Sequence, residues 1–147
     1  MSVFQSLNIS ASGLTAQRFR SDVIAENIAN VNTTRTANGT PYRRQVVTFT
    51  EKDNLPFTHH LARTKYGAIG NGVKVYSLTE DHESDFIMTY DPSHPDADEN
   101  GYVSYPNVNI VTEMTNLIDT SRSYEANATA FEASKSILST GLTLGQS

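Results

Sequence analysis

The last 40 residues of the chain repeat apolar positions at alternating steps of four and three. Eight of the ten positions on this frame carry apolar, small or aromatic side chains, which places them along one stripe of a helix. The ten positions are Ile110, Met114, Leu117, Ser121, Tyr124, Ala128, Phe131, Lys135, Leu138 and Leu142. A helix from Asn109 to Leu142 would extend about 50 Å at ~1.5 Å per residue. That is longer than a small globular core can cover.

The start of this helix is marked by polar and proline residues. Pro106 disfavours helix before it, and Asn107 or Asn109 can serve as the N-cap, because a short polar side chain accepts hydrogen bonds from the first free amides. Val111 and Ile118 widen the apolar stripe beyond a strict two-stranded seam. This width favours a helix bundle.

The first 30 or so residues also predict a helix, with a less regular frame. Arg18 and Ser21 interrupt it, and Phe19, Val23 and Ile24 supply a second stripe near the interruption. The frame consists of Phe4, Leu7, Ala11, Leu14, Ala25 and Ile28. We expect this helix to make apolar contacts on more than one side.

The middle of the chain is typical of short strands. "YRRQVVTFT", "GNGVKVYSLTE" and "SDFIMTYD" are β-branched and aromatic runs bounded by turn residues. We therefore predict an α+β fold in which long N- and C-terminal helices pair as a coiled-coil-like stalk and a small antiparallel β domain is inserted between them. The expected divisions are an N-terminal helix in 1–33, a β-rich region in 34–106 and a C-terminal helix in 107–147.

Composition excludes several classes of function. The net charge of -5 argues against a nucleic-acid partner, which selects a basic surface. The chain has no cysteine, which removes disulfides and thiolate metal sites. No run approaches the roughly 18 apolar residues of a membrane span, so we expect no direct membrane insertion. The first 30 residues also lack the pattern of a cleavable signal peptide.

The length of the helical stripes leaves two interpretations open. In the first, another copy of the chain covers the apolar surface that the small β domain cannot reach. A head-to-tail contact of that kind repeats into an open helical filament. In the second, the chain is a monomeric helical hairpin and both stripes belong to its own core.

Three segments resemble the bacterial flagellar rod family. "ASGLTAQRFRSDVIAENIANVNT" is similar to the N-terminal helix of that family and its Ala-Asn-x-Asn-Thr ending, formed here by Ala29, Asn30, Asn32 and Thr33. "GTPYRRQVVTF" resembles the Pro-Tyr-Arg start of a strand. "HPDADENGYVSYPNVNIVTEMTNLIDTSRSYEANATAFEASKSIL" is similar to the region that leads into the terminal helix. The turn "TTRTANGTPY" points to the proximal-rod type.

This resemblance implies a structural subunit without catalytic residues or cofactors. Family members form the periplasmic drive shaft of the flagellum and transmit torque through it. They are exported by the flagellar type III apparatus without signal cleavage, and they pack their terminal helices into a tube. The implied partners are copies of the chain, other rod proteins and the export apparatus.

The predicted assembly interface combines the two helical frames with the family's asparagines, and it favours the first interpretation. Its members are Phe4, Leu7, Ala11, Leu14, Ile28, Asn30, Asn32, Ile110, Met114, Leu117, Tyr124, Ala128, Phe131, Leu138 and Leu142.

One loop carries a partial calcium-binding pattern. Asp96, Asp98, Asn100 and Gly101 match the first, third, fifth and sixth positions of the D-x-D-x-N-G loop. The twelfth position requires a bidentate acid and is Asn107, so a plain acidic turn is the favoured interpretation. A calcium-binding adhesive or regulatory module is the alternative function. We predict no metal site.

Five arginines in the first 50 residues contrast with an acidic middle. Residues 51–107 carry four bases against ten acids. Facing a neighbouring copy, the arginines could form ion pairs between subunits, whereas an ordinary solvated surface is the alternative. The five are Arg18, Arg20, Arg35, Arg43 and Arg44.

Overall fold

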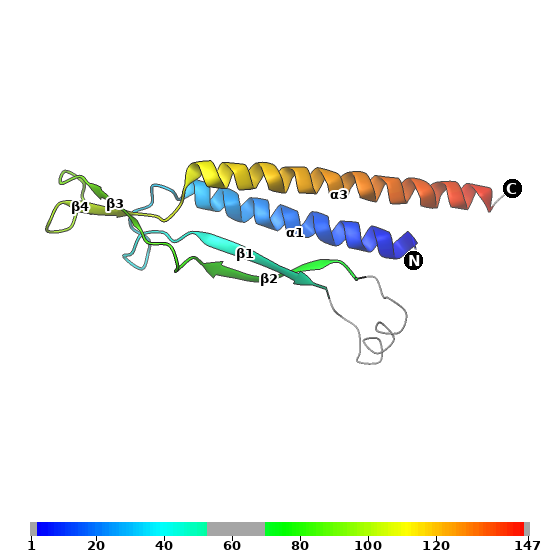
Figure 1. Cartoon of the computed structure of the whole chain (residues 1–147), viewed down its shortest axis with the longest axis horizontal. Helices are drawn as coiled ribbons and strands as arrows, with labels where there is room; N and C mark the ends of the chain where they lie inside the picture. Colours follow the sequence, from blue (N-terminus) through cyan, green and yellow to red (C-terminus); the bar gives the residue numbers. More distant parts are fainter. Residues whose placement is uncertain (1–2, 53–69, 146–147) are drawn as a thin grey trace, which may run out of the picture. The chain divides into compact units, whose positions relative to one another are not determined.

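The computed structural model describes residues 3–52 and 70–145. Its elements are helix α1 (Val3–Ala29), strands β1 (Gln45–Glu51), β2 (Val73–Glu80), β3 (Ile87–Tyr90) and β4 (Tyr102–Tyr105), and helix α3 (Ile110–Leu144) (Figure 1). The strands form two sheets of two strands each, β1 with β2 and β3 with β4. The predicted α+β class, with a helix at each end and small antiparallel sheets between, is confirmed.

The β1–β2 pair is antiparallel, as its terminal hydrogen bonds show. The amide of Asp81 donates to the carbonyl of Arg44 at 2.8 Å, and the amide of Lys52 donates to the carbonyl of Gly72 at 2.9 Å. The beginning of one strand therefore lies beside the end of the other. Strands β3 and β4 are also antiparallel.

The chain divides into two compact units, and each helix contributes to both. The first unit contains residues 1–18, 48–76 and 121–147, and the second contains residues 19–47 and 77–120. We describe each unit by itself.

Helix α3 begins in the second unit with an asparagine cap. The side-chain oxygen of Asn109 accepts hydrogen bonds from the amides of Val111 at 3.0 Å and Thr112 at 3.2 Å. These bonds satisfy donors that have no partner within the helix. Of the two residues predicted for this role, Asn109 is the N-cap and Asn107 has another function.

Asn27 is the centre of a polar core in the second unit. Its side-chain oxygen accepts hydrogen bonds from the Tyr42 hydroxyl at 2.9 Å and the Gln45 amide at 2.8 Å. Its side-chain nitrogen donates to the Gln45 carbonyl at 2.9 Å and to Glu113 at 3.1 Å. All four hydrogen-bonding positions of the amide are filled. One buried side chain of α1 is thus bonded to both β1 and α3.

Glu113 brings a charge into this core. Its side chain is 1% exposed, and Oε1 accepts hydrogen bonds from Nε of Arg44 at 2.9 Å and Nη2 of Arg44 at 2.7 Å. The second carboxylate oxygen accepts the bond from Asn27. A buried carboxylate costs several kcal/mol unless it is paired and hydrogen-bonded. Arg44 and Asn27 offset that cost here.

Asn107 and Asp81 hold the turn region around Arg44. The side-chain oxygen of Asn107 accepts a hydrogen bond from the amide of Arg44 at 2.9 Å. Its side-chain nitrogen donates to the carbonyls of Asp81 at 3.0 Å and Ser84 at 3.2 Å. Hydrogen bonds from the backbone and hydroxyl of Ser84 lower the pKa of Asp81, and Arg44 at 3.8 Å acts in the same direction. Arg44 therefore lies between two carboxylates.

In the first unit, small and polar residues join α1 to α3. The Ser6 and Ser134 hydroxyls are 3.4 Å apart. Gly13 lies so close to Asn127 that an added Cβ would be 2.6 Å from its side-chain oxygen. As the residue number rises along α1 it falls along α3, so the two helices run antiparallel in this unit.

The β1–β2 hairpin approaches α1 closely in the same unit. Gly72 has a φ of +102°, and a Cβ at this position would clash with the Ser12 hydroxyl. The Val73 amide donates to that hydroxyl at 3.1 Å. Glycine is required here both for the backbone conformation and for the space.

The buried side of α1 differs from the predicted heptad frame. Among the frame residues, Phe4 and Ala25 are exposed, and the other four are half-buried. The buried positions of the helix are Ser10, Gly13 and Ala16 in the first unit and Val23, Ile24 and Asn27 in the second. The small residues let the backbones approach closely, and Asn27 can be buried because its hydrogen bonds are filled.

Replacing Glu113 by alanine should lower the free energy of unfolding by about 2–4 kcal/mol, because Arg44 and Asn27 lose their acceptor. Urea unfolding followed by circular dichroism would measure this. Glu125→Ala is the matched control, since Glu125 is an exposed acid on the same helix. Equal losses from the two substitutions would contradict the role assigned to Glu113.

Tyr42 should make stability depend on alkaline pH. Burial, and then the charges of Glu26, Glu113 and Glu80, raise its pKa from 10.0 to about 12. Because the folded state holds the proton more tightly, this contribution is complete below pH 10 and is lost as pH rises through about 12. Relative to Tyr42→Phe, the native protein should lose about 2 kcal/mol of unfolding free energy over that range. Parallel pH profiles for the two proteins would contradict it.

Candidate assembly interface

The predicted interface residues of α1 are reachable from solvent. Phe4 is 66% exposed, and Leu7, Ala11, Leu14 and Ile28 are half-buried. None of the five is in the fully buried set of the described residues. Their side chains retain surface that a neighbouring molecule could cover.

The predicted residues of α3 fall into two groups. Leu117, Ala128, Phe131 and Leu138 are half-buried, so they already contribute to packing within their own units. The exposed group consists of Ile110, Met114, Tyr124 and Leu142.

The first turns of α3, in the second unit, have an exposed apolar face. It consists of Ile110, Val111, Met114 and Ile118, and Val111 is 74% exposed. With about 100° of rotation per residue, these positions lie within a sector of roughly 100°. We call this set the α3 apolar face. Ile110 and Met114 belong to the apolar stripe predicted from the sequence. Val111 and Ile118 are the two residues predicted to widen that stripe.

The sequence reasoning missed the buried side of α3. Of its 35 residues, only Glu113 and Thr120 are buried. Both lie on a polar line that repeats every seven residues through Asn127 and Ser134. This polar repeat is the signal in the sequence for the buried side, and a pattern of apolar residues does not reveal it.

The asparagines of the family-like ending have different positions. The side chain of Asn30 donates a hydrogen bond to the Glu26 carbonyl at 3.0 Å and accepts one from the Thr33 hydroxyl at 3.2 Å. Asn30 therefore caps the C-terminus of α1. Asn32 is exposed. Tyr42, from the Pro-Tyr-Arg motif, is the residue that reaches Asn27. These motifs therefore shape the chain's own fold at Asn30 and Tyr42.

Three of the five arginines bind within the second unit. Arg44 pairs with Glu113, the Arg43 guanidinium lies 4.3 Å from the Phe86 ring centroid, and Arg35 lies 3.5 Å from Asp96. Arg18 is exposed and Arg20 is half-buried. Intersubunit ion pairing therefore becomes a proposal mainly for these last two arginines.

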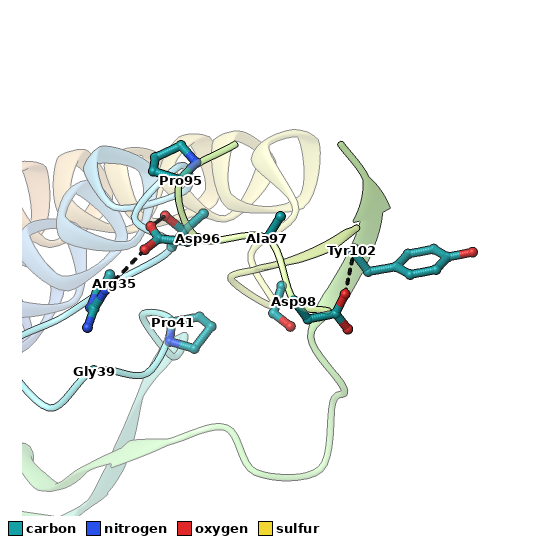
Figure 2. Close-up of a pocket in the computed structure, with 10 residues that line it drawn as sticks. Arg35, Gly39, Pro41, Pro95, Asp96, Ala97, Asp98 and Tyr102 are labelled. Carbon is teal, nitrogen blue, oxygen red and sulfur yellow. Dashed lines mark hydrogen bonds and ion pairs between the residues drawn. The ribbon is translucent and has the colours of Figure 1, made fainter. Parts of the chain in front are cut away.

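The acidic loop holds its carboxylates in local hydrogen bonds. Asp96 accepts the Thr34 hydroxyl at 2.8 Å and faces Arg35, and Asp98 accepts the Tyr102 amide at 2.8 Å (Figure 2). They line an open pocket of about 370 Å³. Within residues 3–52 and 70–145, no group of three histidine, aspartate or glutamate side chains is arranged to hold a metal ion.

No helix in the described part of the chain is long and apolar enough to cross a membrane.

Two family models match the ends of the chain. Residues 7–35 match the model of the flagella basal body rod protein, and residues 99–144 match the C-terminal model of the flagellar basal body rod FlgEFG proteins. These ranges include most of α1 and all of α3.

Relatives match along the whole length. The chain is 46% identical to the flagellar basal-body rod protein FlgC of Borreliella burgdorferi, over 99% of both chains. It is 47% identical to FlgC of Bacillus subtilis, over 99% of this chain and 100% of the relative. FlgC of Salmonella typhimurium is 38% identical over 99% of this chain and 100% of the relative. With such identities from end to end, the chain belongs to the FlgC family of flagellar basal-body rod proteins.

Proposed function

We propose that this flagellar rod protein is a structural subunit of the proximal rod that assembles with copies of itself and other rod proteins through its terminal helices. The observation that carries the proposal is the surface of α3. This helix buries two of its 35 residues and exposes eight large apolar side chains. The eight are Ile110, Val111, Met114, Ile118, Tyr124, Ile137, Leu142 and Leu144.

Contact with a neighbouring molecule would remove these exposed apolar side chains from water. Removing apolar surface from water contributes about 25 cal/mol per Å², and a contiguous apolar patch on a soluble protein is typical of an interaction site. If neighbours contact one another head to tail, repetition of the contact generates a helical array. A helical tube of subunits could transmit torque across the periplasm.

The other functional assignments rest on family membership and the sequence. We propose export through the flagellar type III apparatus without a cleaved signal peptide, and a location in the basal body. The names of the relatives describe rod proteins, which supports a structural role and no enzymatic one. The division into helices 1–33 and 107–147 around region 34–106 remains part of this proposal.

Substitution of the α3 apolar face should block assembly. In the double variant Met114→Asp and Ile118→Asp, two charges replace exposed apolar side chains. The second unit should still fold, because neither side chain is buried in it, but the subunit should no longer be incorporated into the rod. The measurement is motility, together with subunit content of purified basal bodies, in a strain that lacks its own copy. These positions are sharper probes than Leu117 or Phe131, which are half-buried.

Thr112→Asp is the matched control for that experiment. Thr112 is exposed on the same turns of α3 but lies outside the apolar sector, and an acid is favourable in the first turn of a helix. Normal motility is expected for it. A motile double variant with normal basal bodies would contradict the proposed interface.

The terminal helices should be weakly protected before assembly. A long helix with so few buried residues gains little from tertiary packing and is marginal in water. Amide exchange of the dilute monomer should therefore be fast through most of residues 121–140 and slower near Glu113. Full protection over residues 110–140 at low concentration would overturn this expectation.

A further inference from the structure

The β3–β4 hairpin of the second unit is covered on one strand only. All four residues of β3 are exposed, whereas Val103 on β4 has no exposed surface. Ile87 lies opposite Tyr105, and Tyr90 lies opposite Tyr102. The side chains of β3 are thus more exposed than those of β4.

The outer edge of β4 is closed at Tyr102. The Tyr102 amide donates to the Asp98 carboxylate at 2.8 Å (Figure 2). The Asp98 amide donates to the Tyr102 carbonyl at 2.8 Å. Both backbone groups of Tyr102 therefore point away from β3 and toward the 96–98 segment. The loop that follows β3 returns to cover this edge of its partner strand.

Among the described residues, none covers the outer edge of β3 in this way. The Asp91 amide donates to the Gly101 carbonyl at 2.9 Å, which sets the alternation of the ladder. Backbone groups of Thr89 and Ile87 then face β4, and those of Met88 and Tyr90 face outward. The sheet has two strands in the described chain, so no third strand pairs with these groups.

The side chains beside this edge are apolar and exposed. Tyr90 is 64% exposed and packs edge to face on Tyr102, with ring centroids 5.3 Å apart. The Ser104 hydroxyl donates to the Met88 sulfur at 3.1 Å on the same face. Natural proteins usually protect a free edge with a short strand, a charge, proline or a bulge. Residues 87–90 contain no charge and no proline, and Asp85 and Asp91 lie outside the strand. The apolar edge itself is therefore open to strand addition.

Charge disfavours a second copy as the added strand. Asp85 and Asp91 flank β3. In an antiparallel self-pair centred on Met88, each Asp85 would lie opposite an Asp91. A parallel self-pair would place each aspartate near its own equivalent. Like charges directly opposite each other destabilise a sheet.

We propose that the open edge of β3 binds an extended segment of a different protein chain. The segment contributes apolar side chains over Met88 and Tyr90 and two basic residues six positions apart, the spacing of Asp85 and Asp91. Backbone hydrogen bonds give this contact its affinity, and the flanking charges select the partner. The contact is independent of the helical interface, because its residues lie outside both terminal helices.

Two synthetic peptides test the inference on the full-length protein. The peptides are Lys-Val-Thr-Val-Thr-Val-Lys and the same sequence with Glu at both ends. At low salt the basic peptide should slow amide exchange at Met88 and Tyr90 and leave Ile87 and Thr89 unchanged. The acidic peptide should bind about tenfold more weakly, as expected for two exposed ion pairs replaced by repulsions.

Three variants separate the edge from general electrostatics. Asp85→Lys should abolish the preference between the peptides, whereas Glu99→Lys changes the charge equally, in the nearby loop, and should preserve it. Tyr90→Pro should remove binding, because it deletes an outward donor, while the Asp91 amide stays protected. The inference is overturned if the basic peptide fails to bind at millimolar concentration. Protection of Met88 that rises with protein concentration alone would identify a second copy as the occupant and overturn it too.

Discussion

The buried ion pair between Glu113 and Arg44 is the interaction on which the second unit depends. A carboxylate with 1% exposure is stable only where donors fill both of its oxygens, and the guanidinium of Arg44 and the amide of Asn27 supply them. Few alternative registers of the helices and β1 could meet that requirement. Apolar contacts alone tolerate sliding by one turn, but this set of hydrogen bonds does not. We infer that the ion pair helps to specify one arrangement of these elements.

This use of polar residues inside leaves many apolar residues of the helices exposed. In the first unit, Ser6 meets Ser134 and Gly13 meets Asn127, and apolar residues such as Phe131 and Leu138 are only half-buried beside them. Met114 and Ile118 remain exposed in the second unit. A subunit that spent its apolar residues on its own core would have little left for its neighbours. Polar contacts fix the internal register, and apolar surface is available for association.

The sequence predicted the elements better than their orientation. Periodicity located both helices, turn residues located the strands, and Asn109 was one of two predicted caps, because these signals act over a few residues. The buried side of α3 was not predicted. Glutamate is almost never fully buried without a partner, and the partner of Glu113 lies 69 positions away at Arg44. The position of Glu113 in the helical repeat does not reveal its pairing with Arg44. The residues assigned to the assembly interface remain predictions.

Two exposed surfaces of the second unit differ in the kind of recognition they support. Contacts of the α3 apolar face are hydrophobic and therefore not directional. Their specificity must come from the shape of the surface and from the register that Glu113 imposes. The edge of β3 offers directional backbone groups at Met88 and Tyr90, flanked by acids that disfavour self-pairing. If the α3 apolar face binds copies of the chain, as proposed, and the β3 edge disfavours them, the subunit can join an array of like subunits and still bind an unlike chain. The placement of Asp85 and Asp91 is what separates the two roles.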